Sequence, residues 1–273
     1  MITYTLNNGV IKPALGLGTY LIPNDEVFNV VTNALEIGYR AIDTAQFYQN
    51  ETGIGKALKE STLNRDELFI TTKVWNSHQG YDKTMAAFEA SLQALQLDYI
   101  DLYLIHWPTP MYDKYVETYK ALEKLYEDGV VKAIGVSNFH IEHLERIANE
   151  CNVKPVVNQV ECHPYFQQQD VKKYCAKHNI YVESWSPLGR GRLLEDKTIK
   201  HIAKRHDKTA AQVIIRWHLE EQSIVIPKSV TRGRLEENFN VFDFSLTKDE
   251  LATIAELDRH LRTGHDPNEM DIR

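Results

Sequence analysis

The stretch LYLIH at residues 102–106 is a short apolar run that ends in a polar residue, and it begins a pattern that indicates the fold class. A stretch with the spacing of an amphipathic helix follows over residues 115–127, and a second apolar run follows over 133–137. Two apolar runs joined by an amphipathic helix are typical of a βαβ unit with parallel strands. We therefore predict a parallel sheet covered by helices.

The same order of apolar run and amphipathic helix recurs about eight times along the chain. The expected strands are 15–18, 40–43, 68–73, 102–106, 133–137, 156–159, 180–184 and 224–226. The expected helices include 25–37, 52–59, 83–95, 115–127, 140–148, 169–178 and 210–220. Eight units in a chain of 273 residues fit the α/β class as a (β/α)8 TIM barrel, and they predict a single domain over residues 1–273.

An open, doubly wound sheet that binds dinucleotides is the other α/β architecture to consider, and its first turn carries the glycine fingerprint GxGxxG. That fingerprint follows none of the expected strands, and Gly16-Leu17-Gly18 lacks the third glycine. Ahead of the barrel, Asn8-Gly9 lies between β-prone residues, which is a strong hairpin signal. We expect an N-terminal β-hairpin over residues 4–11 that plugs the N-terminal mouth of the barrel.

Charge and cysteine content argue against several classes of protein. Lys and Arg total 31 against 38 Asp and Glu, and the net charge of -7 does not suit a surface for nucleic acid or anionic lipid. The three cysteines lack CxxC spacing, which indicates free thiols in a reducing compartment. Residues 1–5 do not resemble a leader, and every apolar stretch is shorter than the ~20 residues of a membrane span. We expect a cytoplasmic protein.

Four polar residues stand at or just after expected strand ends, namely Asp43, Tyr48, Lys73 and His106. The carboxyl ends of the strands meet at one face of a TIM barrel, so these side chains are predicted to converge there. Singly, each also fits a structural role such as a helix cap or a packed ring. Together they form a chemical unit, because a phenol with a pKa of about 10 acts as a general acid only beside groups that favour loss of its proton. A lysine ammonium supplies that bias, and a carboxylate holds the lysine.

Four motifs spread over most of the chain carry a family resemblance. They are GYRAIDTA at residues 38–45, LYLIHWP at 102–108, GVSNF at 135–139 and IPKS at 226–229. With these motifs in this order, the sequence resembles the aldo-keto reductase superfamily, in a short-tailed prokaryotic branch similar to 2,5-diketo-gluconate and glyoxal reductases. The resemblance implies an NADPH-dependent oxidoreductase that reduces aldehydes or ketones, with Tyr48 as proton donor. Negative charge would develop on the carbonyl oxygen, where the Tyr48 hydroxyl and a His106 N–H would stabilise it.

The resemblance also implies where the cofactor lies. Ser137, Asn138 and Gln159 would hold the nicotinamide carboxamide, and Trp185 offers a flat face for its ring. The remaining expected contacts with NADPH come from the first strand, the loop after the seventh strand and the segment after the eighth. They are Gly18, Thr19, Ser186, Leu188, Gly189, Lys228, Ser229, Arg234, Glu237 and Asn238.

The segment after the eighth strand favours NADPH over NADH. Lys228 and Arg234, with the Ser229 hydroxyl, form a cationic cluster on an acidic protein, and such a cluster suits a 2'-phosphate. A solvated helix start is the alternative interpretation of these cations.

Aromatic residues are expected to surround a small-molecule carbonyl substrate, although they do not identify it. The expected substrate-binding residues are Tyr20, Trp75, His106 and Trp107, with Phe47 and Tyr112 beside them. The tail over residues 263–268 lacks a regular pattern and is expected to fold across the active face. We expect a monomer, because the sequence alone locates no exposed apolar stripe.

Three alternatives use other residues. The 11 histidines are scattered and match no zinc spacing, so no metal site is predicted. A glycoside hydrolase needs two inward carboxylates, for which Glu161 and Glu183 are candidates, but this leaves Tyr48 and Lys73 unexplained. An NADPH-binding regulatory or sensing protein with little turnover would keep the same residues, and the sequence does not separate it fully from an enzyme.

Overall fold

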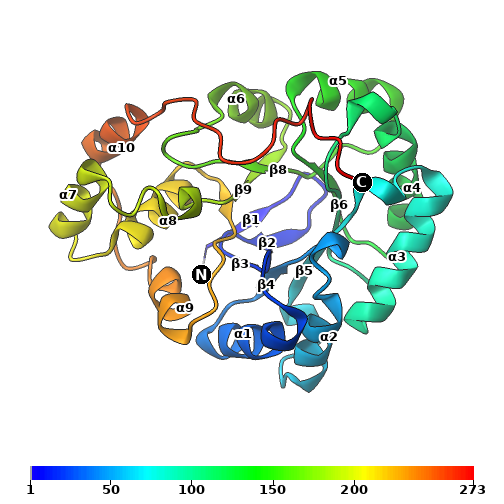
Figure 1. The fold of residues 1–273 in the computed structure, drawn as a ribbon, viewed down its shortest axis with the longest axis horizontal. Coiled ribbons are helices and arrows are strands. Elements are labelled where there is room, and N and C mark those ends of the chain that lie inside the picture. Colours follow the sequence, from blue (N-terminus) through cyan, green and yellow to red (C-terminus); the bar gives the residue numbers. More distant parts are fainter. Residues whose placement is uncertain (1) are drawn as a thin grey trace.

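The computed structural model describes residues 2–273, and Met1, which the predicted domain includes, lies outside them. Eight parallel strands form one sheet that curls into a barrel, and helices surround it (Figure 1). The strands are β3 Leu17–Gly18, β4 Ala41–Asp43, β5 Phe69–Val74, β6 Leu102–Ile105, β7 Ile134–Ser137, β8 Val157–Glu161, β9 Tyr181–Trp185 and β10 Ile224–Val225. Each strand pairs with the next along the chain. The predicted (β/α)8 class is confirmed.

Short contacts between the first and last strands close the barrel. Isolated parallel bridges join Leu15 to Val225 and Gly18 to Lys228. The predicted strand 15–18 was too long, because residues before Leu17 meet the last strand only through such single bridges. Gly18 suits this closure, since a Cβ there would lie 2.7 Å from the Ile226 carbonyl oxygen.

The helices follow the predicted order, with three that the sequence prediction omitted. They are α1 Asn24–Ile37, α2 Glu51–Glu60, α3 Tyr81–Leu95, α4 Tyr115–Glu127, α5 Ile141–Glu150, α6 Gln169–Lys177, α7 Lys197–Arg205, α8 Ala210–Glu220, α9 Arg232–Phe239 and α10 Lys248–Ala255. The omitted helices are α7, α9 and α10. Helix α7 is capped by Asp196, whose carboxylate accepts the Thr198 and Ile199 N–H groups, and α10 begins with a capping box between Thr247 and Glu250. The residues that form these caps can be recognised in the sequence.

The N-terminal hairpin is confirmed and is slightly longer than predicted. Strand β1 (Thr3–Thr5) pairs antiparallel with β2 (Ile11–Pro13), and the two lie at the centre of the ring of helices in Figure 1. The Asn8 side chain donates a hydrogen bond to the Lys132 carbonyl, just before β7. Leu6 packs in an apolar cluster with Leu102 and Val156, which lie at the start of β6 and just before β8. The hairpin therefore covers the N-terminal mouth of the barrel.

The two ends of the barrel interior differ in polarity, and this difference positions the site. The apolar cluster around Leu6 fills the end near the hairpin. Toward the carboxyl ends of the strands the interior holds buried charged side chains, among them Asp43 and Lys73. The C-terminal tail, red in Figure 1, runs from α10 across this polar end. Within residues 2–273, no helix combines the length and apolar character needed to cross a bilayer.

Candidate active site

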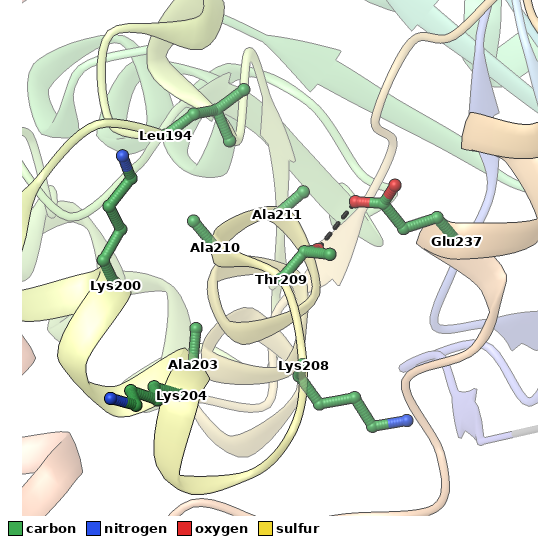
Figure 2. A pocket seen from close by; sticks show the side chains of 9 residues that line it. All are labelled: Leu194, Lys200, Ala203, Lys204, Lys208, Thr209, Ala210, Ala211 and Glu237. Carbon is green, nitrogen blue, oxygen red and sulfur yellow. Dashed lines mark hydrogen bonds between the residues drawn. The ribbon is translucent and has the colours of Figure 1, made fainter.

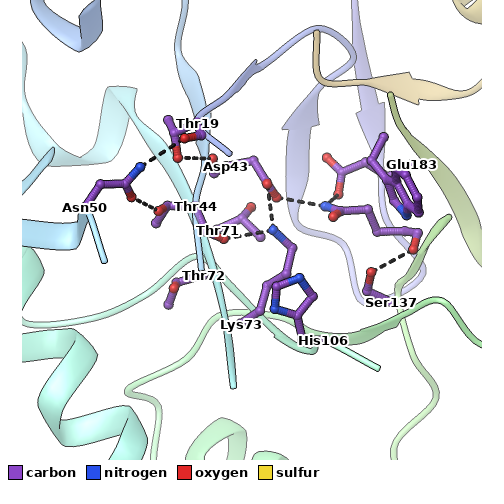
Figure 3. A network of polar contacts seen from close by, with 12 residues as sticks. Thr19, Asp43, Thr44, Asn50, Thr71, Thr72, Lys73, His106, Ser137 and Glu183 are labelled. Atoms are coloured by element: carbon purple, nitrogen blue, oxygen red, sulfur yellow. Dashed lines mark hydrogen bonds and ion pairs between the residues drawn. The ribbon is translucent and has the colours of Figure 1, made fainter. Parts of the chain in front are cut away.

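Lys73 and Asp43 form a buried ion pair at the carboxyl ends of β5 and β4. Lys73 Nζ lies 2.6 Å from Asp43 Oδ1 and also donates a hydrogen bond to the Thr44 carbonyl oxygen at 2.8 Å (Figure 3). Asn50 in turn receives a hydrogen bond from the Thr44 hydroxyl and donates to the Thr19 carbonyl oxygen. Each partner is held by backbone or buried side chains, so the ammonium has one defined position.

Tyr48 and His106 lie directly beside this pair. Tyr48 is the last residue of the 3-10 turn Gln46–Tyr48 that follows β4, and Lys73 Nζ lies 5.1 Å from the centre of its ring. His106 follows β6, and its ring centre lies 5.6 Å from that of Tyr48. The structure therefore brings together all four residues that the sequence placed at strand ends.

The environment determines the protonation of the two rings. Burial, followed by the charge of Asp43, raises the pKa of the Tyr48 phenol well above its ordinary value. Burial, followed by the charge of Lys73, lowers the pKa of His106 well below its ordinary value. Near neutral pH, Tyr48 is thus a protonated phenol and His106 a neutral imidazole, which can offer one N–H to a substrate oxygen.

Gln159 joins the ion pair to the residues expected around a nicotinamide ring. Its Nε2 donates to Asp43 Oδ2 at 2.7 Å and to Glu183 Oε2 at 3.0 Å. Both amide hydrogens are used, which leaves Oε1 as the free acceptor. Asn138 donates to the His106 carbonyl oxygen and accepts the Trp185 indole N–H at 2.8 Å. Ser137 donates to the Gln159 carbonyl oxygen, so the predicted carboxamide-binding residues form one group.

Other predicted cofactor residues lie around the same face. The Thr19 hydroxyl donates to the Asp43 carbonyl oxygen at 2.9 Å, and Gly18 packs at the barrel closure. After β9, the Gly189 N–H donates to the Ser186 carbonyl oxygen and forms a tight turn around Leu188. Gly189 has a φ of 54°, and a Cβ there would collide with the buried Leu193 side chain, so a larger residue in this turn would be strained.

The cations near α9 separate into two kinds. Arg232 contacts Glu36 and Glu236, which is the pairing expected of a solvated helix start. Lys228 and Arg234 are exposed and form no ion pair with an acid in the described part of the chain. Ser229 is buried, and its Oγ finds no hydrogen-bond partner among residues 2–273.

A cavity of about 390 Å³ lies between α7, α8 and α9 (Figure 2). Glu237 lines it and accepts a hydrogen bond from the Thr209 hydroxyl at 2.6 Å. Ala210, Ala211 and Leu194 give it an apolar lining. Asn238, the neighbour of Glu237 on α9, is buried.

Aromatic residues cover the other side of the tetrad, which is the name used here for Asp43, Tyr48, Lys73 and His106. The buried rings of Trp75 and Trp107 pack against Met270 of the tail. Phe47 stacks on Trp75 with ring centres 3.8 Å apart, and Tyr20 lies 5.0 Å from Tyr48. Tyr112 donates a long hydrogen bond, 3.4 Å, to the Asp271 carbonyl oxygen.

Glu161 attaches the tail to this face, a role the sequence did not suggest. Its carboxylate accepts the N–H and hydroxyl of Thr263, the Gly264 N–H at 2.9 Å, and a hydrogen bond with His163 Nε2 at 3.1 Å. Burial acts to raise the pKa of Glu161, but these hydrogen bonds outweigh it and lower the pKa. A Cβ at Gly264 would lie 2.5 Å from the Trp185 ring, so the tail passes very close to the barrel.

Neither of the two carboxylates weighed for glycoside hydrolysis is free. Glu161 holds the tail, and Glu183 faces Lys12 and Gln159 inside the barrel. Among residues 2–273, no group of three or more His, Cys, Asp or Glu side chains is arranged to hold a metal ion.

Comparison with known proteins agrees with this geometry. A model of the aldo/keto reductase family matches residues 14–259. The 9,11-endoperoxide prostaglandin H2 reductase of Trypanosoma cruzi is 51% identical over 97% of this chain and 94% of its own, and the methylglyoxal reductase DkgA of Escherichia coli is 50% identical over 97% and 96%. The crystal structure of a Gox0644 mutant in complex with NADPH superposes with a TM-score of 0.96 at 49% identity, over 99% of each chain. The chain therefore belongs to the aldo/keto reductase family.

Proposed function

We propose that this protein is an NADPH-dependent reductase of small aldehydes and ketones, with Tyr48 as the proton donor. The observation that carries the proposal is the buried Lys73–Asp43 pair beside the Tyr48 and His106 rings. When bound, NADPH supplies a hydride to the carbonyl carbon. The Tyr48 hydroxyl gives its proton to the carbonyl oxygen, and the Lys73 ammonium stabilises the phenolate that remains. Neutral His106 orients the oxygen through an N–H.

Residues of this protein suit both the nicotinamide end and the 2'-phosphate end of NADPH. Gln159 Oε1 is free to accept from the carboxamide, while Asn138 and Trp185 hold each other in place. At the other end, the unpartnered Ser229 hydroxyl lies in the same segment as Lys228 and Arg234 and suits a 2'-phosphate. The cavity beside Glu237 has room for an adenine ring.

Replacing both Lys228 and Arg234 with Ala is expected to weaken NADPH binding about 100-fold or more, because two charge-assisted contacts are lost. NADH lacks the 2'-phosphate, so its affinity should change less than about threefold. Titration of the nicotinamide fluorescence measures both dissociation constants.

Arg232→Ala is the matched control, because Arg232 lies on the same helix but is paired with Glu36 and Glu236. It should leave the preference for NADPH intact. An equal loss of affinity for both cofactors in the double variant would contradict the assignment of the 2'-phosphate site.

The substrate class we propose is small aldehydes, dicarbonyls and keto-sugars, with methylglyoxal as the first test. Support comes from the aromatic walls around Tyr48 and from the methylglyoxal reductase among the relatives. Loss of NADPH absorbance with methylglyoxal, glyoxal and a keto-sugar measures the activity. Turnover on these compounds is expected. NADPH binding without turnover on any of them would replace the proposal with a sensing role.

Glu161→Gln is expected to loosen the tail, because its amide nitrogen replaces one of the two oxygens that accept hydrogen bonds from Thr263 and Gly264. KM for methylglyoxal should rise about tenfold while kcat changes less, since Met270 of the tail packs on Trp75 and Trp107. Limited trypsin digestion should cut after Arg262 faster than in the wild type. Unchanged cleavage and KM would mean that Glu161 does not hold the tail in solution.

We also propose that residues 1–273 act as one domain and that the protein is a cytoplasmic monomer. The family model covers residues 14–259 without interruption, and the hairpin and tail both pack on the barrel. The three cysteines are unpaired, as suits a reducing compartment.

A further inference from the structure

Lys12 is a buried lysine that the proposed reaction does not use. It belongs to β2 of the N-terminal hairpin, and only 1% of its surface is exposed. Its Nζ points into the barrel interior, where it donates a hydrogen bond to the Thr71 hydroxyl at 3.4 Å and lies 4.2 Å from the centre of the Phe69 ring. A buried ammonium needs a negative partner. That partner is Glu183, whose Oε1 lies 3.1 Å from Lys12 Nζ.

Glu183 connects Lys12 to the tetrad. The carboxylate is fully buried on β9, and its Oε2 accepts a hydrogen bond from Gln159 Nε2 at 3.0 Å. The same Gln159 nitrogen donates to Asp43 Oδ2 at 2.7 Å, and Asp43 Oδ1 receives Lys73 at 2.6 Å. Figure 3 shows Glu183, Asp43 and Lys73 in one network of polar contacts. The hairpin at one mouth of the barrel is thus joined to the site at the other.

Lys12 supplies the positive charge that faces Glu183 in this network of contacts. Glu183 and Asp43 carry two negative charges and share one Gln159 nitrogen, while Lys73 and Lys12 carry the two positive charges. The Lys12 contact is mainly electrostatic, because Glu183 Oε1 lies within ion-pair distance of Lys12 Nζ but has no hydrogen-bond partner among residues 2–273. Without Lys12, one ammonium would face two buried carboxylates.

We propose that Lys12 is a positioning residue for carbonyl reduction, because it neutralises Glu183 and so holds Gln159, Asp43 and Lys73 in their places beside Tyr48. This inference rests on the proposed function of the tetrad. It goes beyond that function, since Lys12 enters the barrel from the mouth opposite the substrate and contacts none of the four residues directly.

The titration of Asp43 reports on this role. Burial raises the pKa of Asp43, the charge of Lys73 lowers it, and the charge of Glu183 raises it again. The titratable and charged groups that face Asp43 and its partner Lys73 come from several elements. They are Lys73, Glu183, Tyr48, Glu51 and His106, with Lys12 behind Glu183.

Lys12→Met tests the proposal, because methionine fills similar volume without a charge. The acidic limb of kcat for methylglyoxal should move upward by roughly one pH unit, because an uncompensated Glu183 disfavours ionised Asp43. The carboxyl carbon resonance of Asp43, followed by NMR in cofactor-free protein and assigned with Asp43→Asn, should titrate at correspondingly higher pH. The Lys12→Met/Glu183→Gln double variant removes both charges and should return the Asp43 titration to its wild-type position.

An Asp43 titration that is the same in wild-type and folded Lys12→Met protein overturns the proposal. If Lys12→Met does not fold, Glu183→Gln replaces it. Removing that carboxylate should move the Asp43 titration to lower pH, and no movement overturns the proposal equally. The NMR measurement needs neither cofactor nor substrate. Absence of carbonyl reduction by the wild type would therefore refute the proposed function without deciding the role of Lys12.

Discussion

Tyr48→Phe is expected to lower kcat for methylglyoxal about 10²–10⁴-fold, the range in which a positioned general acid contributes. The phenyl ring can keep its contacts with His106 and Tyr20, so the pocket retains its shape. NADPH affinity should stay within about twofold, because no predicted cofactor contact involves the hydroxyl. Single-turnover measurement of NADPH oxidation separates this loss in the chemical step from any change in cofactor release.

Tyr20→Phe is the control for loss of a phenol near the substrate. Tyr20 lies 5.0 Å from Tyr48 but has no contact with Lys73 through which a phenolate would be stabilised. Its removal should cost far less than removal of the Tyr48 hydroxyl. Full activity in Tyr48→Phe would refute the proton-donor assignment. Because burial, and then Asp43, raises the pKa of Tyr48, wild-type reduction should not slow as pH rises through neutrality.

The sequence predicted the barrel and the tetrad because both follow from local patterns. Apolar runs mark the strands, and a polar residue such as Lys73 or His106 at a strand end must face the same mouth as its counterparts. The hairpin was predicted from a two-residue turn signal at Asn8-Gly9. Helices α7 and α10, nine and eight residues long, were missed although their capping residues are local and α7 buries the regularly spaced Ile199, Ile202 and Ala203.

Lys12, Glu161 and Met270 could not be assigned from the sequence, because their partners are distant along the chain. Glu161 lies in an apolar strand and binds residues 263 and 264, and Met270 lies in a tail without periodicity. Lys12 lies in the hairpin, and its burial beside Glu183 depends on how β2 packs against the barrel. Such contacts depend on how the closed barrel brings chain ends together.

Lys73→Met is expected to destabilise the protein by about 3–5 kcal/mol near neutral pH, the usual cost of leaving one member of a buried ion pair alone. Asp43 would stay buried with only Gln159 as a polar side-chain partner, and the Thr44 carbonyl would lose its donor. Turnover should fall at least about a hundredfold, because nothing then stabilises a Tyr48 phenolate. Urea denaturation followed by circular dichroism measures the stability.

The pH dependence of this loss of stability distinguishes the effect of the charge on Asp43 from the effect of lost packing. In the variant, burial raises the folded-state pKa of Asp43 and no ammonium opposes it, so the folded protein binds a proton more tightly than the unfolded chain. The destabilisation is then complete at neutral pH and shrinks as the pH falls through the raised pKa toward the unfolded value of about 4. Adding Asp43→Asn removes the stranded charge and should recover most of the stability without recovering turnover. A double variant as unstable as Lys73→Met would show that lost packing, and not the charge on Asp43, causes the defect.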